Sequence, residues 1–170
     1  MKVVSRNHPL HESEMCEMNS RVWNPDEKRM YYPPGDRESP VIGLDGEVYT
    51  TEYNGAMYDL IWSPRSIVLR GLGCNYKDEY HQEIYEGDII RIECDSMNYL
   101  RYGVAVWNDA GFAVKNIISG EMWRVENKCM THRTPEHTIS IPFANTVVLG
   151  NKFENYNIIE EVKKSVSSGV

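Results

Sequence analysis

The sequence lacks a long apolar run, a paired cysteine motif and a secretory signal. It has no stretch of about 18 apolar residues, so no membrane-spanning helix is expected. The segment Met1 to Glu12 is polar and has no apolar core of the kind a signal peptide needs. The four cysteines are far apart and have no C-x-x-C spacing: Cys16, Cys74, Cys94 and Cys129. Together these absences predict a cytoplasmic protein with reduced cysteines and no membrane partner.

The chain also lacks an excess of basic charge. It holds 18 Lys and Arg against 25 Asp and Glu, which gives a net charge of -7. Non-specific binding of nucleic acid is driven by neutralisation of phosphates and favours a basic surface. The locally basic positions are Arg21, Lys28, Arg29 and Arg37, and Asp26 and Glu27 interrupt them. A small basic patch assembled in space stays open, so a nucleic-acid-binding small-barrel module is kept as the alternative function.

No catalytic signature is present. Glu83, Glu86 and Asp88 are the nearest candidates for acid and base catalysis. That chemistry needs two carboxylates held across a cleft in different environments. Three carboxylates at one turn fit a solvated start of a strand better, with Asp88 accepting backbone hydrogen bonds of the turn. We therefore expect that the protein is not an enzyme and binds no cofactor.

A metal site has equally little support. Cys129, His132 and His137 are three potential ligands, whereas structural zinc takes about four nitrogen or sulfur ligands. Cys74 or Cys94 would have to complete the set, and the second paired half of a zinc motif is missing. A solvated loop is favoured. A weaker group, rejected for the same reason, consists of His8, His11 and Cys16.

The clearest pattern in the chain lies between Glu83 and Lys115. After Gly87, residues 90, 92 and 94 are apolar and alternate with polar residues, as in a half-buried strand. A polar break at 96–101 precedes a second strand at 102–107. The turn residues 108–111 then lead into a third strand. This order predicts an antiparallel meander, and strands this short avoid exposed edges by closing into a small barrel.

Turn residues between short apolar runs predict further hairpins on both sides of this meander. Before it, the pattern predicts a hairpin from Arg21–Trp23 and Met30–Tyr32, a second from Val41–Leu44 and Glu47–Thr51 around Asp45-Gly46, and a strand at Ile67–Leu69. Residues 53–62 are ambiguous. After it, we expect a hairpin from Ile117–Ile118 and Met122–Val125, a polar loop at 127–140 and a closing strand at Thr146–Leu149.

These elements divide the chain into three parts. Residues 1–20 form an N-terminal extension, and 21–160 form a mainly-β domain, with hairpins at 21–82 and a barrel core at 83–155. A short helix is expected over Ile158 to Lys164, and Ser165 to Val170 is expected to be disordered. We place 161–170 outside the domain as a disordered tail.

Motifs spread from residue 21 to about 155 resemble the YopX family of phage and prophage proteins. They are Arg21-x-Trp23 with Lys28 and Met30, Asp45-Gly46, Val68-Leu69 with Gly71-Leu72, Glu83-Ile-Tyr-Glu-Gly-Asp-Ile89, Gly103-Val104, Gly111-Phe112, Val148-x-Gly150-Asn151 and Glu154-Asn155. The run from Arg70 to His81 departs from the family's Thr-Gly-Leu-x-Asp-x-x-Gly pattern. The resemblance implies a mainly-β fold with an SH3-like barrel, encoded by a phage or prophage and present in a bacterial host cell. It implies no activity and no catalytic residues.

Aromatic residues give two readings. Tyr102, Trp107, Phe112 and Trp123 could form a stacking surface for bases or a groove for a proline-rich peptide. Alternation along strands places about half of such residues inside, so a core role is favoured. Trp23 and Trp62 are likewise predicted to be core anchors.

The acidic balance, the eleven tyrosines and the expected barrel favour a protein-interaction or self-assembling module. Its partner would be an unknown protein or a second copy. The face of the strand opposite Ile90 and Ile92 and the loop after it are the predicted contact surface, made of Arg91, Glu93, Tyr99 and Leu100.

Overall fold

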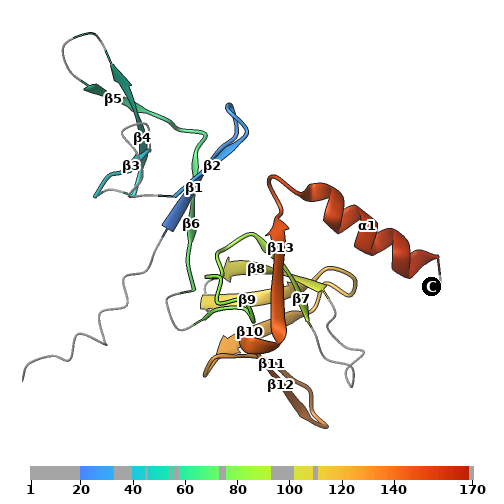
Figure 1. The fold of residues 1–170 in the computed structure, drawn as a ribbon. Coiled ribbons are helices and arrows are strands. Elements are labelled where there is room, and N and C mark those ends of the chain that lie inside the picture. Colours follow the sequence, from blue (N-terminus) through green and yellow to red (C-terminus); the bar gives the residue numbers. More distant parts are fainter. Residues whose placement is uncertain are drawn as a thin grey trace, which may run out of the picture.

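The computed structural model describes residues 20–32, 40–44, 46–53, 55, 58–72, 76–92, 102–108 and 111–168. Within these residues the chain forms three antiparallel sheets, a short 3-10 turn and the helix α1 (Figure 1). The mainly-β class is therefore as predicted. The N-terminal extension lies outside the described residues. In the described part of the chain, no helix combines the length and the apolar character needed to cross a membrane.

The largest sheet, here called the barrel sheet, has seven strands and curls into a half-barrel. Its members are β7 (Asp88–Ile92), β8 (Tyr102–Asn108), β9 (Gly111–Asn116), β10 (Met122–Glu126), β11 (Cys129–Arg133), β12 (Thr138–Pro142) and β13 (Thr146–Asn151). Their order is β12-β11-β10-β9-β8-β7-β13, with antiparallel neighbours throughout. The predicted meander and the closing strand are confirmed. The finer SH3-like assignment stays a prediction.

The inner face of the barrel sheet holds the main core. Ile90 and Ile92 on β7 are buried together, as the alternation predicts, and they share a cluster with Trp123, Met130 and Phe143. Phe143 belongs to the short 3-10 turn Phe143–Asn145 that leads into β13. Burial of large side chains of this kind is the main favourable term in the stability of the sheet.

The predicted polar loop at 127–140 is wrong, because this segment forms the hairpin of β11 and β12. Met130 pairs with Ile141 across the hairpin, and both are buried, as is Ile139. A strand at the edge of a half-barrel needs apolar residues on one face only. The few apolar residues of the segment supply that face, although its composition is polar.

Helix α1 (Tyr156–Ser167) packs on the outer side of the barrel sheet. Ile159 of the helix is buried with Ile89 and Val104 of the sheet, and Val162 is also buried. The predicted disordered tail at 161–170 is therefore wrong as far as Ser167. The helix extends because its apolar stripe is covered by the sheet, which compensates the entropy of ordering it.

A small second sheet, here called the proximal sheet, lies beside the barrel. It contains β1 (Ser20–Asn24), β2 (Arg29–Tyr31) and β6 (Ile67–Arg70), in the order β2-β1-β6. The hairpin of β1 and β2 and the strand at β6 are confirmed predictions. On one face, Trp23 stacks on Phe153, which follows β13, with ring centroids 5.6 Å apart. Trp23 is buried, so it is a core anchor as predicted.

The third sheet, here called the distal sheet, packs on the other face of the proximal sheet. It contains β3 (Val41–Ile42), β4 (Val48–Tyr53) and β5 (Tyr58–Trp62), in the order β3-β4-β5. Val48 is buried against Val22 and Tyr31 of the proximal sheet. Figure 1 shows the distal sheet at the upper left, beyond the proximal sheet and away from the barrel. The predicted hairpin of β3 and β4 is confirmed, and the ambiguous segment before Ser63 contains β5.

Candidate interaction surface

The register of the distal sheet separates its residues into two faces. Trp62 pairs with Tyr49, Leu60 with Thr51, and Val41 with Tyr49. Directly paired residues of antiparallel strands point to the same side. One side, here called the outer face, therefore carries Val41, Tyr49, Thr51, Tyr53, Leu60 and Trp62. The opposite side carries Ile42 and Val48, which pack on the proximal sheet, together with the acidic pair Glu52 and Asp59.

The outer face is apolar and exposed. The exposed fractions are 44% for Val41, 59% for Tyr53, 59% for Leu60 and 57% for Trp62. None of the six residues of the outer face carries a formal charge, and the Glu47 carboxylate lies at the rim, in contact with Trp62. Apolar groups gathered on one sheet face, in contrast to single exposed ones, indicate a contact surface. The core position predicted for Trp62 is therefore wrong, because strand alternation turns it away from the face that Val48 buries.

Hydrogen bonds at the rim orient two of these aromatic side chains. The indole Nε1 of Trp62 donates to Oε2 of Glu47 at 3.0 Å, and the Tyr53 hydroxyl donates to the carbonyl of Gly55 at 2.8 Å. Both partners lie next to β4, at opposite ends of it. Tyrosine and tryptophan held in this way present an apolar ring with little loss of side-chain entropy on binding.

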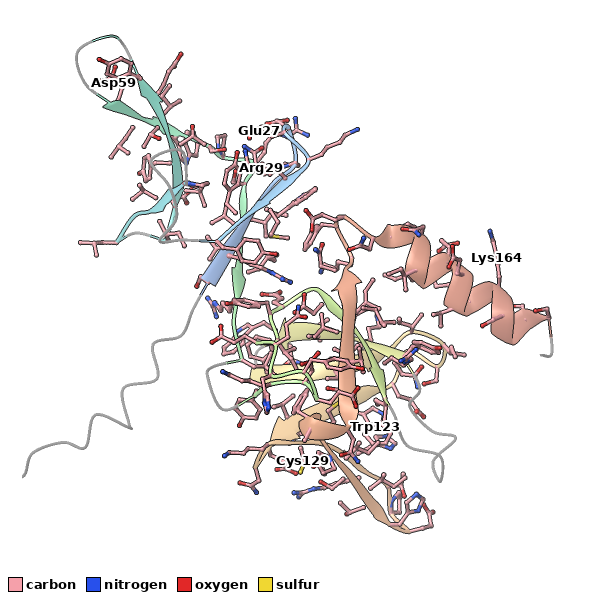
Figure 2. All side chains as sticks on the ribbon, in the orientation of Figure 1. Glu27, Arg29, Asp59, Trp123, Cys129 and Lys164 are labelled. Atoms are coloured by element: carbon pink, nitrogen blue, oxygen red, sulfur yellow. The ribbon has the colours of Figure 1, made fainter. Side chains whose placement is uncertain are left out.

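Strand β5 is also an edge strand. The amide of Ser63 donates to the carbonyl of Val48 at 2.8 Å, which continues the pairing of β5 with β4. Backbone groups of successive residues in a strand point alternately to either side. The backbone groups of Leu60 and Trp62 therefore point away from β4, and no described strand pairs with that edge. Figure 2 labels Asp59 near the far tip of this sheet.

The carboxylates of Asp88 and Glu83, considered above for catalysis, form structural contacts. Asp88 is buried, forms an ion pair with the guanidinium of Arg21 and accepts the amide of Tyr85 at 2.8 Å. Its predicted backbone hydrogen bond is confirmed, but the predicted solvated position is wrong. Burial raises the pKa of Asp88 to about 6, and the nearby positive charge of Arg21 opposes this rise. The Glu83 carboxylate accepts the hydroxyl of Tyr85 at 2.8 Å.

A second buried carboxylate, Asp78, borders a groove of about 550 Å³. It accepts the amides of Tyr80 at 2.9 Å, Gln82 at 2.8 Å and Val148 at 3.0 Å. These three bonds join the loop before the meander to β13. A buried carboxylate whose oxygens accept three backbone amides has a structural role in this loop.

The three potential metal ligands have different surroundings. Cys129 borders the same groove, His132 stacks on Trp123 with centroids 5.0 Å apart, and His137 lies near the Thr134 hydroxyl at 3.2 Å. Among the residues that the structure describes, no group of three His, Cys, Asp or Glu could hold a metal ion. His8, His11 and Cys16 lie outside the described residues.

The aromatic group suggested as a stacking surface is divided between core and surface. Trp123 is fully buried, as the core reading predicts. Trp107 is partly exposed and contacts Phe112 edge to face, with centroids 4.8 Å apart, while the Arg70 guanidinium lies 4.9 Å from the Trp107 ring centroid. Tyr102 is half-buried. No continuous row of free aromatic faces results among the described residues of this group.

Of the four residues predicted to form a contact surface, the structure describes one, Arg91. Arg91 is half-buried on β7, between Tyr102 of β8 and Val147 of β13 in the register. It lies on the side of β7 that also carries Ile89, where α1 packs. Glu93, Tyr99 and Leu100 lie outside the described residues, so their role stays a prediction. Of the basic group, Arg21 is buried, and Arg37 lies outside the described residues.

The sequence contains a weak signal for the outer face of the distal sheet. Leu60, Ile61 and Trp62 are three consecutive apolar residues, a pattern that fits neither a half-buried strand nor a single helix stripe. In a strand, such a run places apolar side chains on both faces. One face of a small sheet then stays uncovered unless a partner covers it.

Comparison with known proteins adds a family and a fold. A family model described as YopX protein matches residues 19–160. The crystal structure of protein yopX from Bacillus subtilis is similar at 16% identity and a TM-score of 0.51, over 81% of this chain and 94% of that chain. A crystal structure of an Enterococcus faecalis protein matches at 15% identity and a TM-score of 0.48, over 84% and 97% of the two chains. The comparison with curated proteins gives no match. At this identity the Bacillus subtilis likeness shows the fold alone.

Proposed function

Because this chain belongs to the YopX family, with the family model spanning residues 19–160, we propose that it is a non-catalytic module that associates with protein through the outer face of the distal sheet. The observation that carries the proposal is the exposure of Tyr53, Leu60 and Trp62 together on one mainly apolar sheet face. An apolar face of this kind loses hydration water on contact with another apolar surface, and that loss drives association.

A non-catalytic role is supported by the use of the buried carboxylates. Asp78 and Asp88 both accept backbone amides, and Asp88 also pairs with Arg21. Each carboxylate joins segments that are far apart in sequence. The acidic net charge of -7 favours protein over nucleic acid as the partner. The role of an accessory protein of a phage or prophage, acting in the host cytoplasm, rests on the family resemblance.

The test compares the outer face with an exposed tyrosine elsewhere. We expect the double variant Tyr53→Ser with Trp62→Ser to lose association, measured by light scattering and by capture of a partner from host lysate. Tyr80→Ser is the matched control, because Tyr80 is 71% exposed and lies outside the distal sheet. Thermal melts of all three proteins show whether the fold is kept.

Three results would count against the proposal. One is association that is unchanged in the outer-face variant. A second is a mobility shift of nucleic acid at low salt whose affinity falls steeply as salt rises, which would establish the alternative nucleic-acid-binding function. Partner retention that both serine variants lose equally would also count against the outer face.

A further inference from the structure

Strand β5 has few of the features by which edge strands avoid pairing, and Asp59 is its one charged residue. Between Tyr58 and Trp62 it has no lysine, no proline and no bulge, and its pairing with β4 is regular over all five residues. Natural edge strands are commonly protected by such features, because an open edge is a template for another strand. An unprotected regular edge next to an exposed apolar face therefore points to a strand partner.

We infer that this partner is a second copy of the same chain, with β5 of each copy paired antiparallel around Leu60 to join the two distal sheets into one. The inference rests on the proposed association function and names the occupant of the edge. A pair centred on one residue is two-fold symmetric, which is the commonest arrangement of homodimers. Both strands of such a pair are β5, so no other segment of the chain has to supply a strand.

The backbone geometry selects this register. The outward-pointing backbone groups of β5 belong to Tyr58, Leu60 and Trp62, since the residues between them bond to β4. Centring on Leu60 pairs Leu60 with its own copy, and Tyr58 with Trp62 of the partner strand. All three outward residues of each strand then exchange hydrogen bonds.

Neighbouring registers are worse for identifiable reasons. Centring on Asp59 places two aspartates directly opposite each other, and like charges in that position are destabilising. Centring on Ile61 places Tyr58 opposite Pro64, which has no amide hydrogen to donate. The Leu60 register places Asp59 opposite Ile61 and avoids both costs.

Charge also favours a copy of the chain at this place. Each copy carries a net charge of -7, so two copies repel over most of their surfaces. The outer face has one charged group, the Glu47 carboxylate that accepts the Trp62 indole at its rim, and the acidic pair Glu52 and Asp59 lies on the other face of the distal sheet. Joining the edges makes a six-stranded sheet with a doubled apolar outer face, which remains available to a further partner.

The dimer is expected to be weak. A pair of five-residue strands buries less than the roughly 800 Å² per partner of a standard stable interface, so we expect a dissociation constant on the order of 10–100 µM. Sedimentation equilibrium of the full chain over that range measures it. A strict monomer throughout the range would overturn the inference while leaving binding of another protein to the outer face intact.

One pair of variants tests the edge itself. Leu60→Pro removes an amide that points outward and spares the bonds to β4, so an edge strand tolerates it. Leu60→Thr removes the same apolar side chain and keeps the amide. We expect Leu60→Pro to weaken self-association by about tenfold or more, and Leu60→Thr to change it by less than about threefold. Equal effects of the two variants would overturn edge pairing.

A cross-linking measurement covers the case in which Leu60→Pro fails to fold. Hydrogen-bonded partners in an antiparallel pair have Cα atoms about 5.5 Å apart, within the range that a disulfide spans. Leu60→Cys is therefore expected to form a covalent dimer on mild oxidation. Thr51→Cys, one strand further from the edge, is the control for the four native cysteines and should give no additional dimer. Cross-linking that is equal in both variants, or absent in Leu60→Cys, contradicts the inferred register.

Discussion

The guanidinium of Arg21 on β1 and the carboxylate of Asp88 on β7 form a buried ion pair across 67 residues of sequence. Arg21 also lies over the ring of Tyr85, with its Cζ atom 4.7 Å from the ring centroid. The pair joins the proximal sheet to the barrel sheet, next to the stacked rings of Trp23 and Phe153. The proximal sheet is thus attached by this charged contact, by the stacked rings and by a backbone hydrogen bond from the Glu86 amide to the Arg70 carbonyl at 2.8 Å.

Arg21→Met is expected to lower the free energy of unfolding by about 3 kcal/mol or more at pH 7, because it leaves the buried carboxylate of Asp88 without its counter-charge. Urea denaturation measures the change. The matched control is Arg65→Met, since Arg65 pairs with Asp26 on the surface and such pairs contribute less than about 1 kcal/mol. Equal effects at the two positions would mean that Arg21 and Asp88 are solvated.

The contribution of Asp88 is expected to depend on pH in a definite direction. Burial raises the pKa of its carboxyl from 3.8 to about 6, so the folded chain keeps this proton to a higher pH than the unfolded chain does. The contribution to stability is therefore fully present below about pH 4 and is lost as the pH rises through about 6. We therefore expect the wild type to lose up to about 3 kcal/mol of stability over that interval relative to Asp88→Asn, whose side chain does not titrate there. Urea titrations at several pH values test this, and a difference that grows with pH would reverse the sign.

Gly87 can be tested against a glycine of similar backbone conformation. Its φ is +86°, and an added Cβ would lie 2.9 Å from Cε2 of Phe153, whereas Gly46 has a φ of +83° and open space around it. Gly46→Ala should cost about 1–2 kcal/mol, for the left-handed conformation alone. Gly87→Ala should cost clearly more in chemical denaturation, because Phe153 must also move. Equal costs would show that the contact with Phe153 adjusts freely.

The core of the barrel sheet gives a further test. Ile92→Asp is expected to destabilise the chain by roughly 3 kcal/mol or more, because it places an unpaired charge among buried apolar residues. Leu60→Asp is the control, since an exposed position on the distal sheet should shift stability by no more than about 0.5 kcal/mol. Thermal melts that show both variants unchanged would mean that the register of β7 is wrong.

The parts of the fold that the sequence predicts are those with local signals. The alternation at Ile90 and Ile92 and the turn at Gly87 give the meander directly, because strand period and turn chemistry act within a few residues. The hairpin of β11 and β12 gave no such signal, since its buried residues Met130 and Ile141 stand among polar neighbours. Its position depends on the barrel sheet that it extends.

The buried ion pair and the candidate surface could not be predicted for a related reason. No pattern near Asp88 in the sequence predicts its ion pair with Arg21, so the carboxylate was expected to be solvated. Trp62 looked like core because large aromatic residues are usually buried. Its exposure follows from the proximal sheet covering only the Val48 side of the distal sheet, which is a property of tertiary packing.

The last prediction separates two possible contact surfaces. The sequence points to Tyr99 and Leu100, and the structure points to the outer face of the distal sheet. We expect the double variant Tyr99→Ala with Leu100→Ala to keep the fold, because the pattern around these residues gives no period that would bury them. Sedimentation of this variant beside Tyr53→Ser with Trp62→Ser compares the surfaces at equal numbers of substitutions. If both pairs weaken association, both surfaces take part in assembly. Unaltered assembly in the alanine pair assigns association to the distal sheet, and loss of folding in that pair would show that Tyr99 and Leu100 belong to the core.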